Sequence, residues 1–395
     1  MEGILLTCER DGTMDIIGHI GTYMDELTAL RRDLHAHPEL GFEESRTAAI
    51  VADLLEQYGC TVHRGVGGTG VVGILQGRSG NGRRIGLRAD MDALPIEEET
   101  NLPYRSTNPG KMHACGHDGH TTMLLGAARY LAETRAFNGT AVLIFQPAEE
   151  GLGGSRAMLK DGLFERFPCD EVYGLHNMPS DRHGHVWLRP GPFMAAADFF
   201  DITVRGRGSH AAWPHRSIDP ILIATGLAQS LQSIVSRNTD ALQSIVLSIT
   251  RFDAGASYNV IPDTAHMSGT IRSFDPEVRA MAAARMRTLA AGIAVAHDAD
   301  ITVEIRDVFS VVENASTQAA AVTEIAGSER VDSDAAPLMG SEDFADMAMA
   351  VPGAFFWLGA GPGPGIHNAG YNFDDSIIPI GSAILARMVE RRTAV

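Results

Sequence analysis

The sequence predicts an α/β protein into which a smaller α+β domain is inserted, and three observations support this. Short apolar segments alternate with helix-like stretches early in the chain, as in a sheet covered by helices on both faces. The pattern changes near residue 190, where F-F-D-I-T-V-R-G (199–206) alternates with period two and predicts a strand with one exposed face. After residue 308 the α/β pattern returns, with a strand at 354–358 and a last helix at 376–391.

Helices are expected where apolar residues recur at a spacing of three or four. In the first of them Leu27, Leu30 and Leu34 share one face, and Pro38 stands just beyond its end. Gly59 is suited to close the second helix. The expected helices of the first part cover 22–37, 43–58 and 120–133, and the expected strands cover 71–75, 84–90, 141–146 and 171–176.

A glycine-rich segment, G-V-G-G-T-G (65–70), matches a dinucleotide-binding pattern. That pattern binds a cofactor only where it follows a strand and opens a helix. Here the glycines precede the strand V-V-G-I-L (71–75), and no helix follows them directly. We interpret the segment as a turn, which removes the main support for an oxidoreductase.

The middle of the chain predicts a separate β-α-β-β-α-β unit, the order of a ferredoxin-like two-layer domain. Its strands and helices are expected at 199–206, 217–236, 244–251, 265–273, 276–297 and 301–308. R-P-G-P-F (189–193) is typical of a linker. We therefore assign 1–190 and 309–395 to one domain and 191–308 to the inserted one.

Composition excludes several classes of protein. The chain has 395 residues, too many for one core, and a formal net charge of −17, which disfavours nucleic acid as a partner. No apolar run reaches the roughly 18 residues of a membrane helix, and the N-terminus does not read as a secretory signal, although Met14 is an alternative start to Met1. The widely spaced cysteines predict a reducing, cytoplasmic setting, and they are Cys8, Cys60, Cys115 and Cys169.

Metal-ligand side chains concentrate in M-H-A-C-G-H-D-G-H (112–120). If the following helix begins near Gly119, Cys115 and His117 lie on the loop before it and can point the same way. Isolated histidines near a turn are more often structural, and we interpret His113 and His120 in that sense.

Four further segments place ligand side chains just after an apolar strand or in a glycine-rich loop. Q-P-A-E-E-G offers adjacent glutamates, of which one can bind a metal while the other stays available as a base. The candidates are Asp90 and Asp92, Glu149 and Glu150, His176, and His367. Several such junctions in one chain predict a common metal site.

Seven sequence motifs, in their residues and in their order, resemble those of the metallo-amidohydrolase family of hippurate hydrolase, bacterial aminoacylases and plant indoleacetyl-amino-acid hydrolases. The motifs are L-R-A-D-M-D-A-L-P, M-H-A-C-G-H-D-G-H, F-Q-P-A-E-E-G, G-L-H-N, G-x-G-S-H-A-A-x-P, N-V-I-P and G-S-E-D-F. The resemblance runs from near Leu30 to the C-terminus. It implies a zinc-exopeptidase-like catalytic domain with an inserted ferredoxin-like lid or dimerisation domain.

The resemblance also implies a site with two divalent ions and a free carboxylate. Its ligands would be Cys115, His117, Glu150, His176 and His367, with Glu149 as general base and Asp90 and Asp92 as supporting residues. Thiolate and imidazole ligands suit zinc, manganese, cobalt or nickel.

In the inserted domain the resemblance makes His210 the group that stabilises the oxyanion, supplied across a dimer interface. Asn259 is a second candidate donor, and Arg272 is a candidate for binding a substrate carboxylate through a bidentate pair. A homodimer or homotetramer is expected. The linker at 189–193 further suggests that the small domain closes over the site and brings His210 to the carbonyl.

These observations favour hydrolysis of the amide bond of N-acyl-L-amino acids by metal-activated water. Two alternatives stay open: a dipeptidase or aminopeptidase with the same site, and a metal-binding homologue without catalysis.

Overall fold

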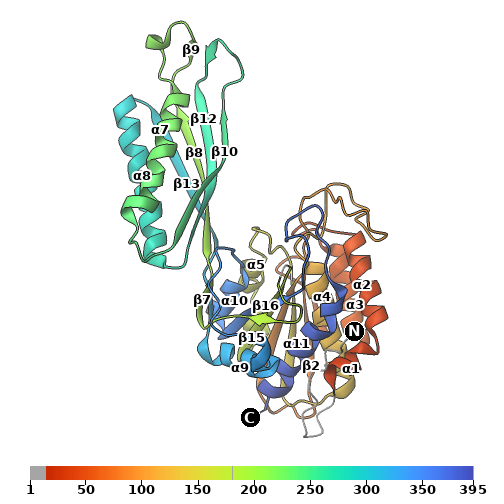
Figure 1. The fold of residues 1–395 in the computed structure, drawn as a ribbon. Coiled ribbons are helices and arrows are strands. Elements are labelled where there is room, and N and C mark those ends of the chain that lie inside the picture. The colour runs from red at the N-terminus through yellow and green to blue at the C-terminus, as the bar shows by residue number, and fades with distance from the viewer. Residues whose placement is uncertain (1–14, 180, 395) are drawn as a thin grey trace. The chain divides into compact units, whose positions relative to one another are not determined.

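The computed structural model describes residues 15–179 and 181–394 (Figure 1). The alternative start at Met14 and the cysteine at position 8 lie outside this range. The chain divides into two compact units. The first comprises Met1–Phe193, Glu313–Ala336 and Asp343–Val395, and the second comprises Met194–Val312 and Pro337–Glu342.

An eight-stranded mixed sheet forms the centre of the first unit, in the order β1-β2-β4-β3-β5-β16-β6-β15. The inner strands β4, β3, β5 and β16 run parallel to one another, so their carboxyl ends meet at one edge. The strands are β1 Thr61–Val66, β2 Gly70–Gln76, β3 Arg84–Asp90, β4 Thr140–Gln146, β5 Glu171–Met178, β6 Val186–Trp187, β15 Val331–Asp332 and β16 Gly353–Gly359. The four strands expected in the first part of the sequence are confirmed as β2 to β5.

Helices cover both faces of this sheet. Tyr173 and Leu175 of β5 belong to the large apolar cluster that also contains α4 and α11, whereas Gly174 between them faces Phe344 of α10. The helices are α1 Ile16–Gly21, α2 Met24–Ala36, α3 Ser45–Gln57, α4 His117–Thr134, α5 Gly154–Lys160, α6 Leu163–Arg166, α9 Ser316–Ala326, α10 Phe344–Ala350 and α11 Ile378–Arg392. The α/β fold class is therefore confirmed for this unit.

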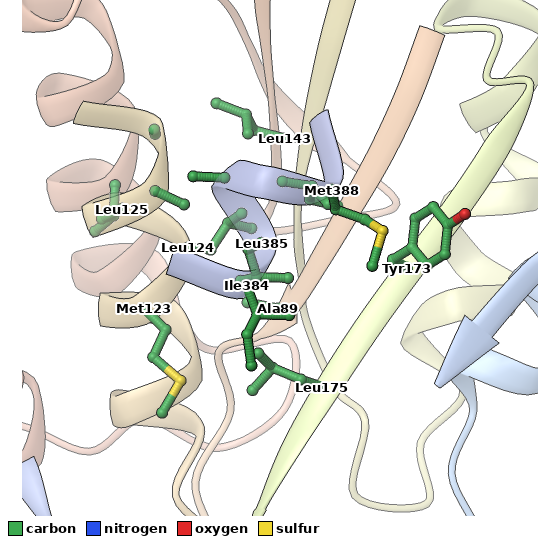
Figure 2. Close-up of a cluster of buried hydrophobic side chains, with 14 of the residues drawn as sticks. Ala89, Met123, Leu124, Leu125, Leu143, Tyr173, Leu175, Ile384, Leu385 and Met388 are labelled. Atoms are coloured by element: carbon green, nitrogen blue, oxygen red, sulfur yellow. The ribbon is translucent and has the colours of Figure 1, made fainter. Parts of the chain in front are cut away.

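The core of the first unit is built where α4 and α11 pack against each other and against the sheet. Figure 2 shows Leu124 of α4 and Leu385 of α11 in one cluster with Ala89, Tyr173 and Leu175 of the strands. Nearly every residue of α4 from its start to Leu131 is buried, which a helix tolerates only when it is covered on all sides. The start of α4 is consequently held rigidly at the carboxyl edge of the strands.

The start of α4 differs from the sequence-based expectation. The helix begins at His117 rather than near Gly119, so His117 and Asp118 belong to its first turn and not to the preceding loop. Gly116 takes a left-handed conformation at the N-cap (φ 103°) and allows the sharp entry. The Asp118 carboxylate accepts a hydrogen bond from the Gly119 amide (2.9 Å), which stabilises the positive end of the helix.

The glycine-rich segment at 65–70 forms the turn of an antiparallel hairpin, as expected. Strands β1 and β2 pair across it, with Val66 opposite Gly70. Gly67 and Gly68 have positive φ values of 67° and 111°. The backbone at these positions favours glycine for conformational reasons and opens no helix.

The second unit is a four-stranded antiparallel sheet in the order β10-β12-β8-β13, with helices α7 and α8 packed on it. Its element order is the β-α-β-β-α-β order read from the sequence. The elements are β8 Ala196–Arg205, β9 Ser209–His210, α7 Pro220–Ser233, β10 Ile245–Ala254, β11 Val260–Ile261, β12 Thr264–Ser273, α8 Pro276–His297 and β13 Asp300–Phe309. The role of this unit as a lid or dimerisation domain stays a prediction.

The expected linker at 189–193 is only partly a linker. Residues Gly191–Met194 form strand β7, which pairs with β14, Val312–Asn314. The two chain segments that leave and re-enter the first unit are thus hydrogen-bonded to each other. The backbone groups that a free linker would expose are satisfied by this pairing.

Over the residues that the structure describes, no helix is both long and apolar enough to cross a membrane.

Candidate metal centre

The candidate ligands come from segments that are distant in sequence and meet at the carboxyl edge of the sheet. Asp90 ends β3, Glu149 and Glu150 follow β4 after Pro147, and His176 lies near the end of β5. Because β3, β4 and β5 are parallel neighbours, their ends place these side chains together. The remaining candidates are Cys115 and His117 at the start of α4 and His367 in the glycine-rich loop before α11.

Five of the predicted residues form two groups of three that share Cys115. In the first group, Cys115, His117 and His176 have ligand atoms within 4.8 Å of one another, and the same holds for Cys115, Glu150 and His367 in the second. The Cys115 Sγ atom lies 3.2 Å from His176 Nε2 and 3.3 Å from His367 Nε2. One thiol therefore stands between two potential cation positions, each completed by two further donors.

Glu149 belongs to neither of the two groups that contain Cys115, but it lies next to them. Its carboxylate belongs to a third close group, with His117 and Glu150, and the residue is almost fully buried. A carboxylate next to the ligands and shielded from bulk water has the placement of a general base.

Asp92 links the two halves of the centre. One of its oxygens lies 3.2 Å from His117 Nδ1, and the other accepts a hydrogen bond from the Glu150 backbone amide at 3.0 Å. With its proton on Nδ1, His117 presents the Nε2 lone pair to the centre. In the same way His176 donates from Nδ1 to the Asn177 carbonyl (2.7 Å), which leaves its Nε2 towards Cys115.

Asp90 belongs to a buried charged network that the sequence did not predict. Arg88 donates to Asp90 (2.8 Å), to Gln146 (2.8 Å) and to Asp343 (3.0 Å), and all four side chains are buried. His120, interpreted from sequence as structural, lies 2.6 Å from the other Asp90 oxygen. The available signal was the period-two spacing of Arg88 and Asp90 along β3, which puts both on one face.

Burial and neighbouring charges set the protonation of the groups at the centre. Burial raises the pKa of the Cys115 thiol well above its usual value, and Glu150 and Glu149 add to this shift. Burial alone would lower the pKa of His117, but Asp90 and Asp92 outweigh it and raise this pKa to about 10. Without a cation, Cys115 and His117 therefore keep their protons. A metal ligand must instead offer a lone pair, and so must lose its proton at the coordinating atom. A divalent ion reverses both preferences, since a coordinating thiol loses its proton.

Two orphaned atoms test whether a cation fits. His117 Nε2 and Glu150 Oε1 are buried and make no hydrogen bond, although Glu150 Oε1 lies 3.3 Å from His367 Nε2. Leaving such groups unsatisfied costs about 1–3 kcal/mol each, more for a charged group. Coordination would satisfy both atoms, and a set of thiolate, imidazole and carboxylate donors suits zinc, manganese, cobalt or nickel. The residues present fit divalent cations.

The family model that describes the Peptidase family M20/M25/M40 matches residues 86–391. The chain belongs to this family. The hippurate hydrolase of Campylobacter jejuni is 42% identical over 379 residues, covering 95% of this chain and 98% of that enzyme. An N-acetylcysteine deacetylase of Bacillus subtilis is 40% identical over 367 residues, covering 92% of this chain and 95% of that enzyme. The resemblance read from the motifs is confirmed.

A solved structure within the M20 family has the same fold. It is the Bacillus subtilis YXEP protein, described as a dinuclear metal binding peptidase, with 35% identity, a TM-score of 0.80, and coverage of 94% of this chain and 98% of that one. This likeness confirms the zinc-exopeptidase-like fold of the catalytic unit.

Two non-glycine residues at this M20 centre have a left-handed backbone. Ala148, directly before Glu149, has a φ of 52°, and the predicted ligand His367 has a φ of 60°. Non-glycine residues in the left-handed region cost on the order of 1–2 kcal/mol each. His367 is fixed by a hydrogen bond from its amide to the Ala114 carbonyl (2.7 Å). The fold thus imposes local strain where it positions the residues of the centre.

The three candidates in the second unit fall into two places. His210 on β9 and Asn259 before β11 are neighbours, since these short strands pair and the Ala211 amide donates to the Asn259 carbonyl (3.0 Å). Arg272 lies at the other end of β12, where its guanidinium donates to the Ser341 hydroxyl. Their roles towards a substrate stay predictions.

Replacing Cys115 with alanine should lower the metal content from about two ions per chain to one or none, because the thiolate belongs to both groups of ligands. The measurement is elemental analysis of the purified protein after dialysis against manganese or zinc.

The matched control for this change is Cys60→Ala, which removes another buried thiol outside the groups described above. It should leave the metal content unchanged. Retention of two ions by the Cys115→Ala protein would exclude Cys115 from the ligands.

Proposed function

We propose that the chain is a metal-dependent amidohydrolase that cleaves the amide bond of N-acyl-L-amino acids, with Glu149 as the general base. Family membership and the near full-length match to a hippurate hydrolase make it a hydrolase that acts on amides. The observation that carries the mechanism is the sharing of Cys115 between two groups of ligands, with the Glu149 carboxylate beside them.

The chemistry divides between the ions and the chain. When bound, two divalent ions supply Lewis acidity, which lowers the pKa of a water molecule and polarises the substrate carbonyl. Glu149 accepts the proton of the attacking water and then delivers it to the leaving amine nitrogen, so that no proton is gained or lost overall. Cys115, His117, Glu150, His176 and His367 would hold the ions. Asp92 orients His117, and Asp90 supports the centre through its contact with His120.

The substrates named for the two relatives have one chemical feature in common. Hippurate and N-acetylcysteine each carry a free carboxylate close to the amide bond that is hydrolysed. Arg272 is suited to bind such a group: it is partly buried, and its NH1 donates to a neutral hydroxyl, that of Ser341. Burial lowers its pKa, which means that its charge is poorly solvated and would be stabilised by an anion.

His210 is proposed to act in the site of a second copy of the chain, as the family resemblance implies. Within the second unit, β9 pairs with β11 just before the start of β12 at Thr264, whereas Arg272 lies at the end of β12. Eight residues of strand span about 26 Å. His210 and Arg272 of one chain therefore cannot both contact one small substrate. If both serve the same substrate, they come from different subunits, which requires a homodimer or a higher oligomer.

The orientation of His210 supports its role as a donor. Its Nδ1 accepts a hydrogen bond from the Ala212 amide (3.1 Å), so a neutral ring carries its proton on the exposed Nε2. Such a donor can stabilise the oxyanion that forms when water attacks the amide. Asn259, next to it, is a second candidate donor.

A reducing, cytoplasmic location is part of the proposal. The described residues include three free cysteines, at positions 60, 115 and 169. Cys115 must be available as a thiolate to hold metal, which an oxidising compartment would endanger.

The Glu149→Gln variant tests the function. The wild-type protein should hydrolyse hippurate or N-acetyl-methionine, lose activity with a chelator and regain it with manganese or zinc. Glu149→Gln should keep its metal but lose about 10²–10⁴-fold in kcat, because the amide cannot accept a proton. Steady-state kinetics and elemental analysis on the same samples provide the measurement.

The alternatives give different results in this assay. Faster turnover of dipeptides than of N-acyl amino acids would favour a peptidase, and tight metal binding without turnover of any amide would favour a binding protein. A Glu149→Gln protein as active as the wild type would refute the proposed base.

The Arg272→Met variant should raise KM for an N-acyl amino acid by about tenfold or more, since a charge-assisted bidentate pair is lost. The KM for the corresponding N-acyl amino amide, which has no carboxylate, should change much less. Equal effects on both substrates would contradict carboxylate binding by Arg272.

Subunit mixing tests the placement of His210. Glu149→Gln and His210→Ala proteins, each inactive alone, should regain about a quarter of wild-type activity after unfolding and refolding together, because half of the dimers are mixed and one site in each is intact. Refolding each variant alone is the control. If mixing restores nothing while wild-type protein recovers, His210 serves its own chain or has no catalytic role.

A further inference from the structure

The loop after β4 carries both glutamates of the centre, and its conformation depends on Ala148. This residue has a φ of 52° and is buried. Its carbonyl accepts a hydrogen bond from the Gly154 amide (3.0 Å), and its own amide donates to the Glu44 carboxylate (2.8 Å). The Glu150 amide is tied separately to Asp92. Glu44 therefore holds the Pro147–Ala148 peptide through the Ala148 amide, and Gly154 holds the Ala148–Glu149 peptide through the Ala148 carbonyl.

Glu44 is a fully buried carboxylate whose two oxygens are both occupied. One accepts from Ala148, and the other accepts from the Thr69 hydroxyl (2.5 Å) in the β1–β2 turn. A buried carboxylate is costly unless it is hydrogen-bonded in this way. The function described so far makes no use of Glu44.

The Glu44 side chain does not stabilise the helix that it precedes. It stands at the N-cap of α3, yet its side chain makes no capping hydrogen bond to that helix. Glu39 provides that contact instead, since its carboxylate accepts from the amides of Arg46 and Thr47 at 2.9 and 2.8 Å. The Glu44 side chain is directed at the loop after β4 and not at its own helix.

The segment before α3 also packs closely on the same loop. A Cβ atom at Gly41 would lie 3.0 Å from the Cα and Cβ atoms of Ala148. Without the acceptor on Glu44, the Ala148 amide would be buried and unsatisfied, and the backbone would gain by returning to negative φ. That rotation would reorient the peptide plane directly before the base.

We propose that Glu44 is a positioning residue for catalysis: by accepting the Ala148 amide it holds Ala148 in the left-handed conformation that aims Glu149 at the metal-bound substrate. The proposal rests on the function proposed above for Glu149. It concerns hydrogen-bond geometry and not the charge of Glu44, which distinguishes it from an electrostatic role.

Two substitutions of Glu44 distinguish the effect of side-chain length from the effect of its charge. Glu44→Asp keeps the charge but withdraws the carboxylate by about 1.5 Å, the length of one carbon–carbon bond, so it loses the Ala148 amide. Glu44→Gln loses the charge but keeps the reach: its oxygen can accept from Ala148, and its amide can donate to the Thr69 hydroxyl. With excess manganese, Glu44→Asp should lower kcat by about 10–100-fold with KM changed by less than about threefold. Glu44→Gln should stay within about threefold of wild type.

A second readout does not depend on activity. In metal-free protein, hydrogen exchange at the Ala148 amide should be at least about tenfold faster in Glu44→Asp than in wild type, and it should stay slow in Glu44→Gln. The double variant Glu44→Asp, Ala148→Gly should have a kcat at least about threefold higher than that of Glu44→Asp, because glycine adopts positive φ without strain.

Glu39→Ala is the matched control, because it removes a carboxylate that binds two amides at the start of the same helix. It should lower the melting temperature and leave kcat unchanged. Wild-type kcat and slow exchange in Glu44→Asp would overturn the proposal, as would a Glu44→Gln protein as slow as Glu44→Asp. If wild-type protein hydrolyses no N-acyl amino acid, the proposed function fails instead, and the exchange measurement still decides whether Glu44 holds the loop.

Discussion

The sharing of Cys115 between two groups of donors is the interaction around which the catalytic unit is organised. A thiolate placed between two cation positions requires that its partners approach from both sides, and they do so from β4, β5, α4 and the loop before α11. Parallel strands supply that convergence because their carboxyl ends meet at one edge. The deep burial of α4 then fixes the start of the helix at this edge, where His117 extends from its first turn.

Charge balance explains why so many acidic and basic groups are buried around the centre. The acidic Asp90, Asp92 and Glu150 surround His117 and raise its pKa, while Arg88 below them compensates part of the negative charge. In the absence of cations this arrangement keeps protons on groups that should donate lone pairs. A bound divalent ion would reverse this preference, because the Cys115 thiol and the His117 imidazole would then lose those protons.

Rigidity of the supporting contacts is as important as the identity of the ligands. Asp92 contacts both the His117 ring and the Glu150 backbone amide, and Glu44 accepts a hydrogen bond from the Ala148 amide. The Glu44 contact is made to Ala148, whose positive φ of 52° is a conformation that non-glycine residues rarely adopt. Strain of this kind persists only where surrounding hydrogen bonds over-determine it.

Local patterns along the chain were enough to predict the class of fold, the order of the elements and the types of side chain at the site. Apolar periodicity reveals strands and helices because it depends only on local geometry, and the ligand motifs at strand ends indicate a metal site for the same reason. Local pattern could not show that one thiol belongs to two groups, that α4 begins at His117, or that Arg88 reaches Asp343 and Glu44 reaches the Ala148 amide. Those features depend on distances between segments far apart in the chain, and such distances are set only when the sheet and its helices pack together.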